Sequence, residues 1–142
     1  MRAVLFVNFH FDIDGDNFTS AGEASVRIKK LLREMGFSPD TIRRVSVAMY
    51  EGEINMVIHA NGGRADVDVY GDRIEIVLAD KGPGIPDIDL AMQEGYSTAP
   101  DNIRSLGFGA GMGLPNMKRY TDDMRIESAL GVGTTIYMTV RT

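Results

Sequence analysis

The sequence predicts an α+β fold, a two-layer sandwich in which helices lie on one face of a mixed, mostly antiparallel sheet. Two runs that alternate apolar and polar residues are separated by Gly71-Asp72, a pair typical of β-hairpin turns. Two longer stretches before them repeat apolar residues at helical intervals, and two further alternating runs close the chain. Such strands and helices bury their apolar surfaces by packing against each other.

Length and composition are those of one globular domain over residues 1–142. The chain is 44% hydrophobic and 25% charged, and it is long enough to bury a core of ordinary size. The formal net charge of -5 argues against direct binding of nucleic acid or of an anionic membrane surface. Cysteine is absent, which excludes disulfides and thiolate metal sites, and two histidines are too few for a His-rich metal cluster.

No stretch approaches the roughly 18 apolar residues that a membrane-spanning helix needs. The first apolar run alternates with polar residues and lacks a small-residue cleavage site, which favours a strand over a signal peptide. We therefore expect a soluble protein in the cytoplasm. The strand is predicted over about Val4 to Ile13, with His10 on its surface.

Two helices are predicted after this strand. Ser20 and Glu23 have the spacing of a capping box, and apolar residues follow them at helical intervals. The second helix is predicted to begin at Ser38-Pro39, with the serine as its cap and the proline in the first helical position. The glycine-rich residues 61–63 are predicted to end it.

The second helix places polar groups on its apolar side. Glu51, Asn55 and His59 stand four residues apart, so they form one row among apolar side chains. Glu53 falls with Tyr50 on the opposite, solvent-facing stripe. A carboxylate and an amide that point toward the core need partners, which a ligand or a metal ion could supply. A satisfied buried polar pair is the alternative.

The second half of the chain alternates strands with glycine-rich loops. A strand runs directly into residues 80–85, and the chain from about 85 to 112 has the weak periodicity typical of a functional lid. The expected elements are strands 65–70 and 73–79, a short helix near 89–93, a helix over 114–120, and closing strands 124–128 and 134–140.

Glycine recurs at every second position from Gly107 to Gly113. The dinucleotide-fold fingerprint needs glycine at positions i, i+2 and i+5, and no glycine of this run starts that pattern. The sequence also lacks a Walker-type phosphate loop. The backbone amides of such a run still suit a phosphate chain, and an ordinary flexible loop is the alternative.

Four motifs follow one another in the sequence and together resemble the four nucleotide-binding boxes of the GHKL ATPases. The resemblance spans nearly the whole chain, from about residue 4 to residue 140. It implies a Bergerat-type ATP-binding fold, a histidine kinase-like ATPase domain. The motifs are Glu51-x-x-x-Asn55 on a helix, Asp80-x-Gly82-x-Gly84 after a strand, the alternating glycines that end in Gly113-Leu114, and Gly133-Thr134 at the last strand.

This resemblance implies a role for each matching residue, with ATP and Mg²⁺ as cofactors. Glu51 is the expected catalytic base, and Asn55 is the expected Mg²⁺ ligand. Asp80 is expected to accept a hydrogen bond from the adenine amino group, with Thr134 assisting through an ordered water. The other expected nucleotide-binding residues are Gly82, Gly84, Ile85, Gly107, Gly109, Gly111, Met112, Gly113 and Leu114.

Three side chains near these motifs have competing interpretations. Glu53 competes with Glu51 as the base, and the place of Glu53 on the solvent-facing stripe favours Glu51. His59 matches a histidine frequent in anti-sigma kinases, although a core-edge histidine bonded to backbone is the favoured interpretation. Arg104 could reach the terminal phosphate, but a solvated surface arginine is favoured.

Within the GHKL group, the chain most resembles the anti-sigma regulatory factors, because we expect no room for a transducer or a phosphoacceptor domain. The resemblance implies a Mg²⁺- and ATP-dependent protein serine/threonine kinase that transfers the γ-phosphate to a small regulatory protein. Its expected partner is a sigma factor or an anti-anti-sigma-like protein, and a homodimer is favoured. The alternatives are an ATP-gated binding switch with little turnover, a detached histidine-kinase catalytic domain, and a domain whose glycines are structural and bind no nucleotide.

Overall fold

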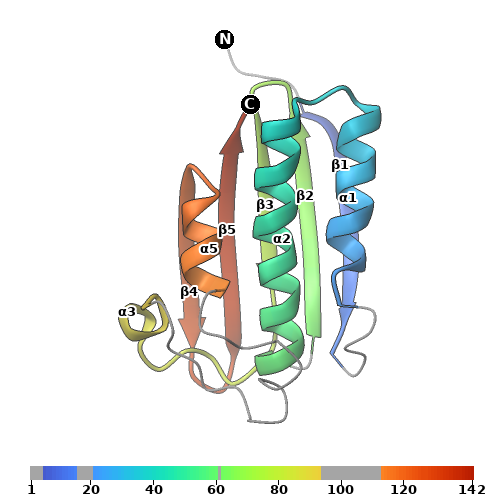
Figure 1. Ribbon diagram of the computed structural model, residues 1–142. Helices are drawn as coiled ribbons and strands as arrows, with labels where there is room; N and C mark the ends of the chain where they lie inside the picture. Colours follow the sequence, from blue (N-terminus) through green and yellow to red (C-terminus); the bar gives the residue numbers. More distant parts are fainter. Residues whose placement is uncertain (1–4, 16–20, 61, 94–112) are drawn as a thin grey trace.

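The computed structural model describes residues 5–15, 21–60, 62–93 and 113–142, and these residues form two layers (Figure 1). One layer is a five-stranded sheet, and the other consists of helices that cover one face of the sheet. The strands are β1 (Leu5–Asp14), β2 (Gly62–Tyr70), β3 (Arg73–Ala79), β4 (Asp123–Ala129) and β5 (Gly133–Arg141). The helices are α1 (Glu23–Glu34), α2 (Pro39–Ala60), the short α3 (Ile88–Ala91) and α5 (Gly113–Arg119).

The strands of the sheet lie in the order β1-β2-β3-β5-β4, and each neighbouring pair is antiparallel. The hairpin of β2 and β3 joins the hairpin of β4 and β5 because β3 pairs with β5, which places Ile76 opposite both Val67 and Met138. β3 and β4 end, and β5 begins, at the lower edge of the sheet in Figure 1. The predicted α+β two-layer fold is therefore confirmed.

The core lies between the sheet and the helices. Alternate strand residues, among them Val67, Ile76 and Met138, are buried on the helix-covered face. The 22-residue helix α2 spans about 33 Å along this face and contributes the fully buried Val45 and Met49. The burial of every second strand residue is the pattern expected for a sheet with one covered face.

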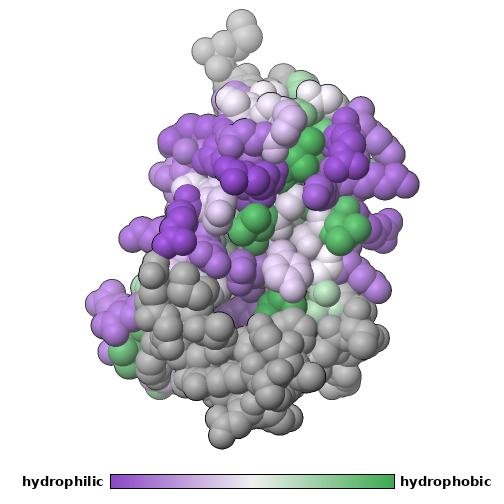
Figure 2. Space-filling model, viewed as in Figure 1, coloured by the Kyte–Doolittle hydropathy of each residue, from purple (hydrophilic) through white to green (hydrophobic). Residues whose placement is uncertain are grey.

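The outward surface of the helical layer is mainly hydrophilic (Figure 2). Single exposed apolar side chains interrupt it, namely Val26, Met35 and Tyr50. On the uncovered face of the sheet, His10 is exposed beside Asp66, as predicted for that strand. Across the described ranges, no helix is both long enough and apolar enough to cross a membrane.

The start of α1 differs from the predicted capping box. The N-cap is Gly22, in the left-handed region at φ 99°, so Glu23 is the first helical residue instead of the third, and Ser20 lies outside the described residues. Amides at the start of α1 donate to the side chain of Glu53 on α2. A Cβ at position 22 would lie 3.0 Å from the ring of Tyr50, so both conformation and space at this turn require glycine.

Other predicted elements are confirmed within a few residues of their expected ends. Ser38 Oγ accepts a hydrogen bond from the Thr41 amide at 3.2 Å, and Pro39 is the first residue of α2. β2 and β3 form the predicted hairpin, and α3 lies close to the predicted short helix. The long helix and the hairpins therefore follow from local sequence signals.

Candidate functional site

Segments far apart in the sequence come together in the lower part of Figure 1: the C-terminal half of α2, the loop after β3, the turn between β4 and β5 and, higher up beside α2, the start of α5. Asn116 of α5 donates to Glu51 of α2, and the Thr134 amide of β5 donates to Asp80. These contacts form two separate pairs, and the close approach of Gly82 to Ala60 at the end of α2 brings the Asp80 loop to the helix that carries Glu51. Outside the described residues lie most of the predicted lid and Arg104, Gly107, Gly109, Gly111 and Met112.

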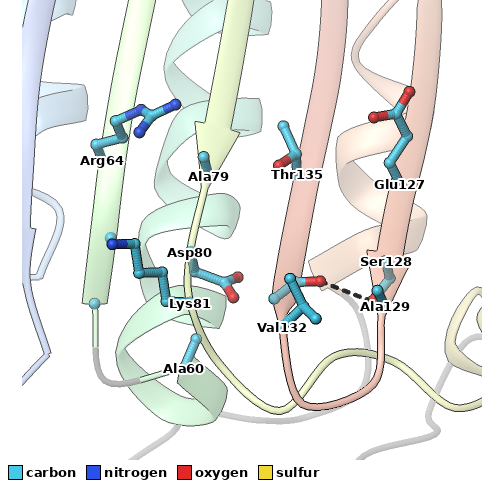
Figure 3. Close-up of a pocket in the computed structure, with 13 residues that line it drawn as sticks. Ala60, Arg64, Ala79, Asp80, Lys81, Glu127, Ser128, Ala129, Val132 and Thr135 are labelled. Atoms are coloured by element: carbon cyan, nitrogen blue, oxygen red, sulfur yellow. Dashed lines mark hydrogen bonds between the residues drawn. The ribbon is translucent and has the colours of Figure 1, made fainter.

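Backbone amides fix the carboxylate of Asp80 where the chain leaves β3. Its Oδ1 accepts from the Gly82 amide at 2.8 Å and from the Thr134 amide at 3.2 Å. The Asp80 amide also donates to the Thr134 carbonyl at 2.9 Å. Figure 3 shows the carboxylate pointing from β3 toward β5. Within the described part of the chain, Oδ2 accepts no hydrogen bond, so it remains available to a donor on a ligand.

Thr134 is buried near the start of β5, with 6% of its surface exposed. Its Oγ1 lies 2.8 Å from Oγ of Ser128, the residue directly opposite on β4. Ser128 Oγ also accepts from the Ile85 amide at 2.7 Å. Sequence reasoning missed Ser128. The sequence does carry a sign of it, because Ser128 is a polar residue that continues the inward-facing series of Met124 and Ile126 along β4.

The glycines after Asp80 lie where the loop closely approaches other elements. A Cβ at Gly82 would lie 2.6 Å from the Cβ of Ala60, the last residue of α2. Gly84 has φ 82°, and a Cβ there would lie 2.6 Å from the carbonyl oxygen of Ala129 at the end of β4. Larger residues would push the loop away from both neighbours. The glycines therefore hold Asp80 and Ile85 at fixed places beside the sheet.

Glu51 is half-buried where α2 faces α5. Its Oε1 accepts from Asn116 Nδ2 at 3.2 Å, and a Cβ at Gly113 would lie 3.7 Å from its Oε2. The candidate base thus lies beside the end of the predicted phosphate-binding glycines. Leu114 packs into the core at 7% exposure, so only its backbone remains for a ligand. Asn116 was not predicted, and a single polar residue on a short helix gives little signal.

Glu53 is buried, and the prediction that it lies on a solvent-facing stripe is wrong. Only 1% of its surface is exposed, because α1 packs on this side of α2. Its Oε2 accepts from the amides of Gly22 at 2.9 Å and Ala24 at 3.2 Å, and its Oε1 accepts from the Ser25 amide at 2.6 Å. Burial raises the pKa of Glu53, and the three amides act in the opposite direction. Glu51 therefore stays the base candidate because Glu53 is fully engaged.

The row predicted along α2 lies at the boundary of the core, with Glu51, Asn55 and His59 each half-buried. Burial lowers the pKa of His59, which favours a neutral imidazole at pH 7 and fits a core-edge histidine. The Asn55 side chain makes no hydrogen bond within the described part of the chain.

The same part of the chain contains no group of three His, Cys, Asp or Glu side chains that could hold a metal ion. Mg²⁺ bound to nucleotide phosphates needs only one or two protein ligands, because phosphates and waters complete its shell. The unengaged amide oxygen of Asn55, one turn beyond Glu51 on α2, fits such a ligand.

A hollow of about 850 Å³ adjoins this site at the lower edge of the sheet, toward the face that the helices leave uncovered (Figure 3). The side chains of Arg64, Lys81 and Glu127 stand around it. It shares Asp80 with the candidate site, but Glu51 on α2 does not line it. The hollow is therefore a neighbour of the site, and the chemistry assigned to Glu51 does not take place inside it.

Residues 17–140 match the model of the family described as the histidine kinase-like ATPase domain. This range contains all four predicted motifs. Since the match covers most of the chain, it applies to the domain as a whole and not to one motif.

Two relatives and one solved structure extend this similarity. The chain is 33% identical over 112 residues to the serine/threonine-protein kinase RsbT of Bacillus subtilis (strain 168), covering 76% of this chain and 78% of that protein. It is 30% identical over 122 residues to an anti-sigma F factor of Priestia megaterium, covering 81% and 80%. The crystal structure of the RsbU and RsbW domains of Rv1364c from Mycobacterium tuberculosis has a TM-score of 0.66 at 19% identity. That match covers 96% of this chain and 32% of the other, and it supports the fold alone.

Proposed function

The chain belongs to the family of histidine kinase-like ATPase domains, and from this premise we propose that it is a protein serine/threonine kinase of the anti-sigma regulatory type. It uses ATP to phosphorylate a small regulatory protein. The observation that carries the assignment of the site is the hydrogen-bonded pair of Asp80 and Thr134, together with the packing of the Gly82 loop against the end of the helix that carries Glu51. Glu51, Asp80 and Thr134 come from three separate motifs, and each keeps a polar side-chain atom that can bond to a ligand.

In this proposal, the adenine base binds beside Asp80. The unengaged Oδ2 accepts a hydrogen bond from the adenine amino group, while two amides hold Oδ1 and so fix the plane of the carboxylate. Thr134 assists at the neighbouring ring nitrogen through a water. The glycines of the run that ends at Gly113 give their amides to the phosphates. A rigid acceptor of this kind binds more tightly than a mobile one, because less side-chain entropy is lost.

Asn55 is the proposed protein ligand of Mg²⁺. When bound, the ion neutralises charge on the phosphates. The place of Asn55 one turn beyond Glu51 puts the metal ligand and the base on the same side of α2.

Glu51 is the proposed general base. It accepts the proton of a serine or threonine hydroxyl as that oxygen bonds to the γ-phosphorus of ATP, and the bond from the γ-phosphorus to the bridging oxygen breaks to release ADP. The hydrogen bond from Asn116 orients the carboxylate through Oε1 and leaves Oε2 to take the proton. Removal of a general base typically slows such a transfer by about 10²–10⁴-fold.

For the partner, we propose a sigma factor or an anti-anti-sigma-like protein, with the latter carrying the phosphorylated hydroxyl. The similarity to a protein named anti-sigma F factor supports this choice. A homodimer and a cytoplasmic location stay predictions.

The test of the nucleotide site is calorimetric titration of ATP and ADP with Mg²⁺ into the wild type and Asp80→Asn. The amide places a donor, or a weaker acceptor, against the adenine amino group, a mismatch worth on the order of 1–3 kcal/mol, so binding should weaken about tenfold or more. Asp40→Asn, an exposed carboxylate at the other end of α2, is the matched control and should bind as the wild type does.

Equal affinity of wild type and Asp80→Asn would show that Asp80 does not contact the base. If the wild type binds ATP but transfers no phosphate to any anti-anti-sigma-like protein, the ATP-gated binding switch replaces the kinase. No binding of ATP by the wild type would remove both functions.

A further inference from the structure

We propose that the exposed face of α1 is a docking surface for an acidic amphipathic helix of a protein partner. This surface, called the α1 basic surface, consists of Val26, Lys29, Lys30 and Arg33. None of the predicted nucleotide-binding residues lies on α1, so the inference goes beyond the proposed kinase function and does not depend on it. The proposal is based on unpaired positive charge around an exposed apolar side chain.

The four side chains of the α1 basic surface point away from the core. At about 100° per residue, they fall within an arc of about 100° on the helix. The opposite side of α1 is buried and carries Ala24, Ile28 and Leu32. Val26 is 67% exposed, and in Figure 2 an apolar patch interrupts the hydrophilic surface over α1. Val26 therefore lies among three cations and is largely open to solvent.

The cations of the α1 basic surface differ from the arginines of α2 and of the strands. Within the described residues, Lys29, Lys30 and Arg33 form no ion pair. The chain as a whole has a net charge of -5, so acidic side chains are not scarce. The α1 basic surface is therefore positive charge that the described residues leave unbalanced. The arginines of α2 and of the strands each pair with a carboxylate at 2.6–3.6 Å, namely Arg43, Arg44, Arg64, Arg73, Arg125 and Arg141.

Local helix stability does not explain this choice of residues. Lys29 and Arg33 stand four residues apart, and like charges at that spacing destabilise a helix. Valine is also a poorer helix former than alanine, because the preceding turn of the helix restricts its side chain. Both features become favourable when an acidic helix packs against α1. Its carboxylates then pair with the cations, and an apolar side chain covers Val26.

A protein helix fits this surface better than a nucleic acid or a membrane does. The net charge of -5 repels a long polyanion or an anionic membrane, whereas a folded partner presents its acidic charge only where it meets α1. Backbone groups along the middle of α1 are bonded within the helix, so recognition uses side chains, as when one helix packs on another. A helix with an acidic face and an apolar stripe is the complement.

The experiment measures the binding of a synthetic peptide by fluorescence anisotropy, at low salt and without nucleotide. The peptide consists of about 20 residues of glutamate, alanine and leucine, long enough to be helical by itself, with its leucines on one face. Lys29→Glu/Arg33→Glu should weaken binding about tenfold or more, because like charges then meet. Lys118→Glu/Arg125→Glu changes the net charge equally at exposed positions outside α1, and this matched control should bind as the wild type does.

Two further results separate docking from a loss of folding. A peptide with lysine in place of glutamate should bind Lys29→Glu/Arg33→Glu more tightly than it binds the wild type. Val26→Ala should weaken binding of the acidic peptide several-fold. The same variant should leave the free energy of unfolding unchanged or higher, because alanine is the better helix former at an exposed position.

The proposal is overturned if the wild type does not bind the acidic peptide, or if both double variants weaken binding equally. Binding to vesicles of phosphatidylcholine and phosphatidylserine, but not to the peptide, would assign the surface to a membrane instead. A wild-type dimer that Lys29→Glu/Arg33→Glu dissociates would assign it to a second copy of the chain. Failure of the wild type to bind ATP would contradict the proposed function and leave the peptide result unaffected.

Discussion

Glu51 and Glu53 stand two residues apart on the same helix, yet they lie in opposite environments. Glu53 is 1% exposed and accepts three hydrogen bonds from amides at the start of α1. Glu51 is half-buried and accepts one hydrogen bond, from Asn116 on α5, within the described part of the chain. One carboxylate faces the start of α1, and the other faces the candidate site.

The difference shows that burial alone does not identify a functional carboxylate. The three amides around Glu53 engage both of its oxygens, so it acts as the cap that α1 lacks at Gly22. Glu51 keeps an oxygen that can accept a proton. The two carboxylates therefore differ in how many hydrogen bonds each can still accept. If the structural role of Glu53 and the catalytic role of Glu51 are separate, substitutions at the two positions should affect different properties.

The largest effect is expected for Glu53→Ala on stability. Three amides that are bonded in the wild type would lose their acceptor beneath α1, and the free energy of unfolding should fall on the order of 3 kcal/mol. Urea denaturation followed by circular dichroism measures this. Glu34→Ala, at the exposed C-terminal end of α1, is the matched control and should change stability little. A Glu53→Ala protein as stable as the wild type would contradict the role of Glu53 as the cap of α1.

The next effect is expected for Glu51→Gln on catalysis, with stability nearly unchanged. Glutamine can still accept the Asn116 hydrogen bond but cannot take a proton, so phosphotransfer in a single-turnover assay should slow by about 100-fold or more. ATP affinity by calorimetry should stay close to that of the wild type. Undiminished transfer to the protein substrate would show that Glu51 is not the base.

The smallest effect is expected at His10, on the sheet face far from both carboxylates. Hydrogen bonds to Asp66 at 2.8 Å and to Asp12 at 3.1 Å raise the pKa of His10 above its usual 6.5. The folded state therefore binds the proton more tightly than the unfolded state does. The resulting contribution to the free energy of unfolding is fully present below pH 6.5 and is lost as pH rises through the folded pKa. His10→Asn should flatten a slight decline in the urea midpoint as pH rises above 6.5. A change in the phosphotransfer rate in the same variant would contradict the separation of regions.

Local patterns predicted much of this molecule. Ser38-Pro39 marked the start of α2, and Gly71-Asp72 marked the hairpin, because capping and turn chemistry act over a few residues. Glu51 and Asp80 were also recognised, since each sits in a short motif with a required spacing.

Contacts between distant segments could not be predicted in the same way. Ser128 meets Ile85 across 43 positions, and Asn116 meets Glu51 across 65. The capping box at Glu23 was predicted wrongly because the acceptor for the first amides of α1 comes from another helix. No spacing rule relates such pairs.

By itself, the sequence determined the elements, the alternation that buries one face of the sheet, and the motifs that indicate a nucleotide. Only the tertiary structure decided which of two neighbouring glutamates is buried and which remains open, and which serine sits behind Thr134. The physical reason is that periodicity gives the direction of a side chain about its own helix or strand, whereas burial and hydrogen bonding depend on what packs against it. For Glu53, the packed element is α1.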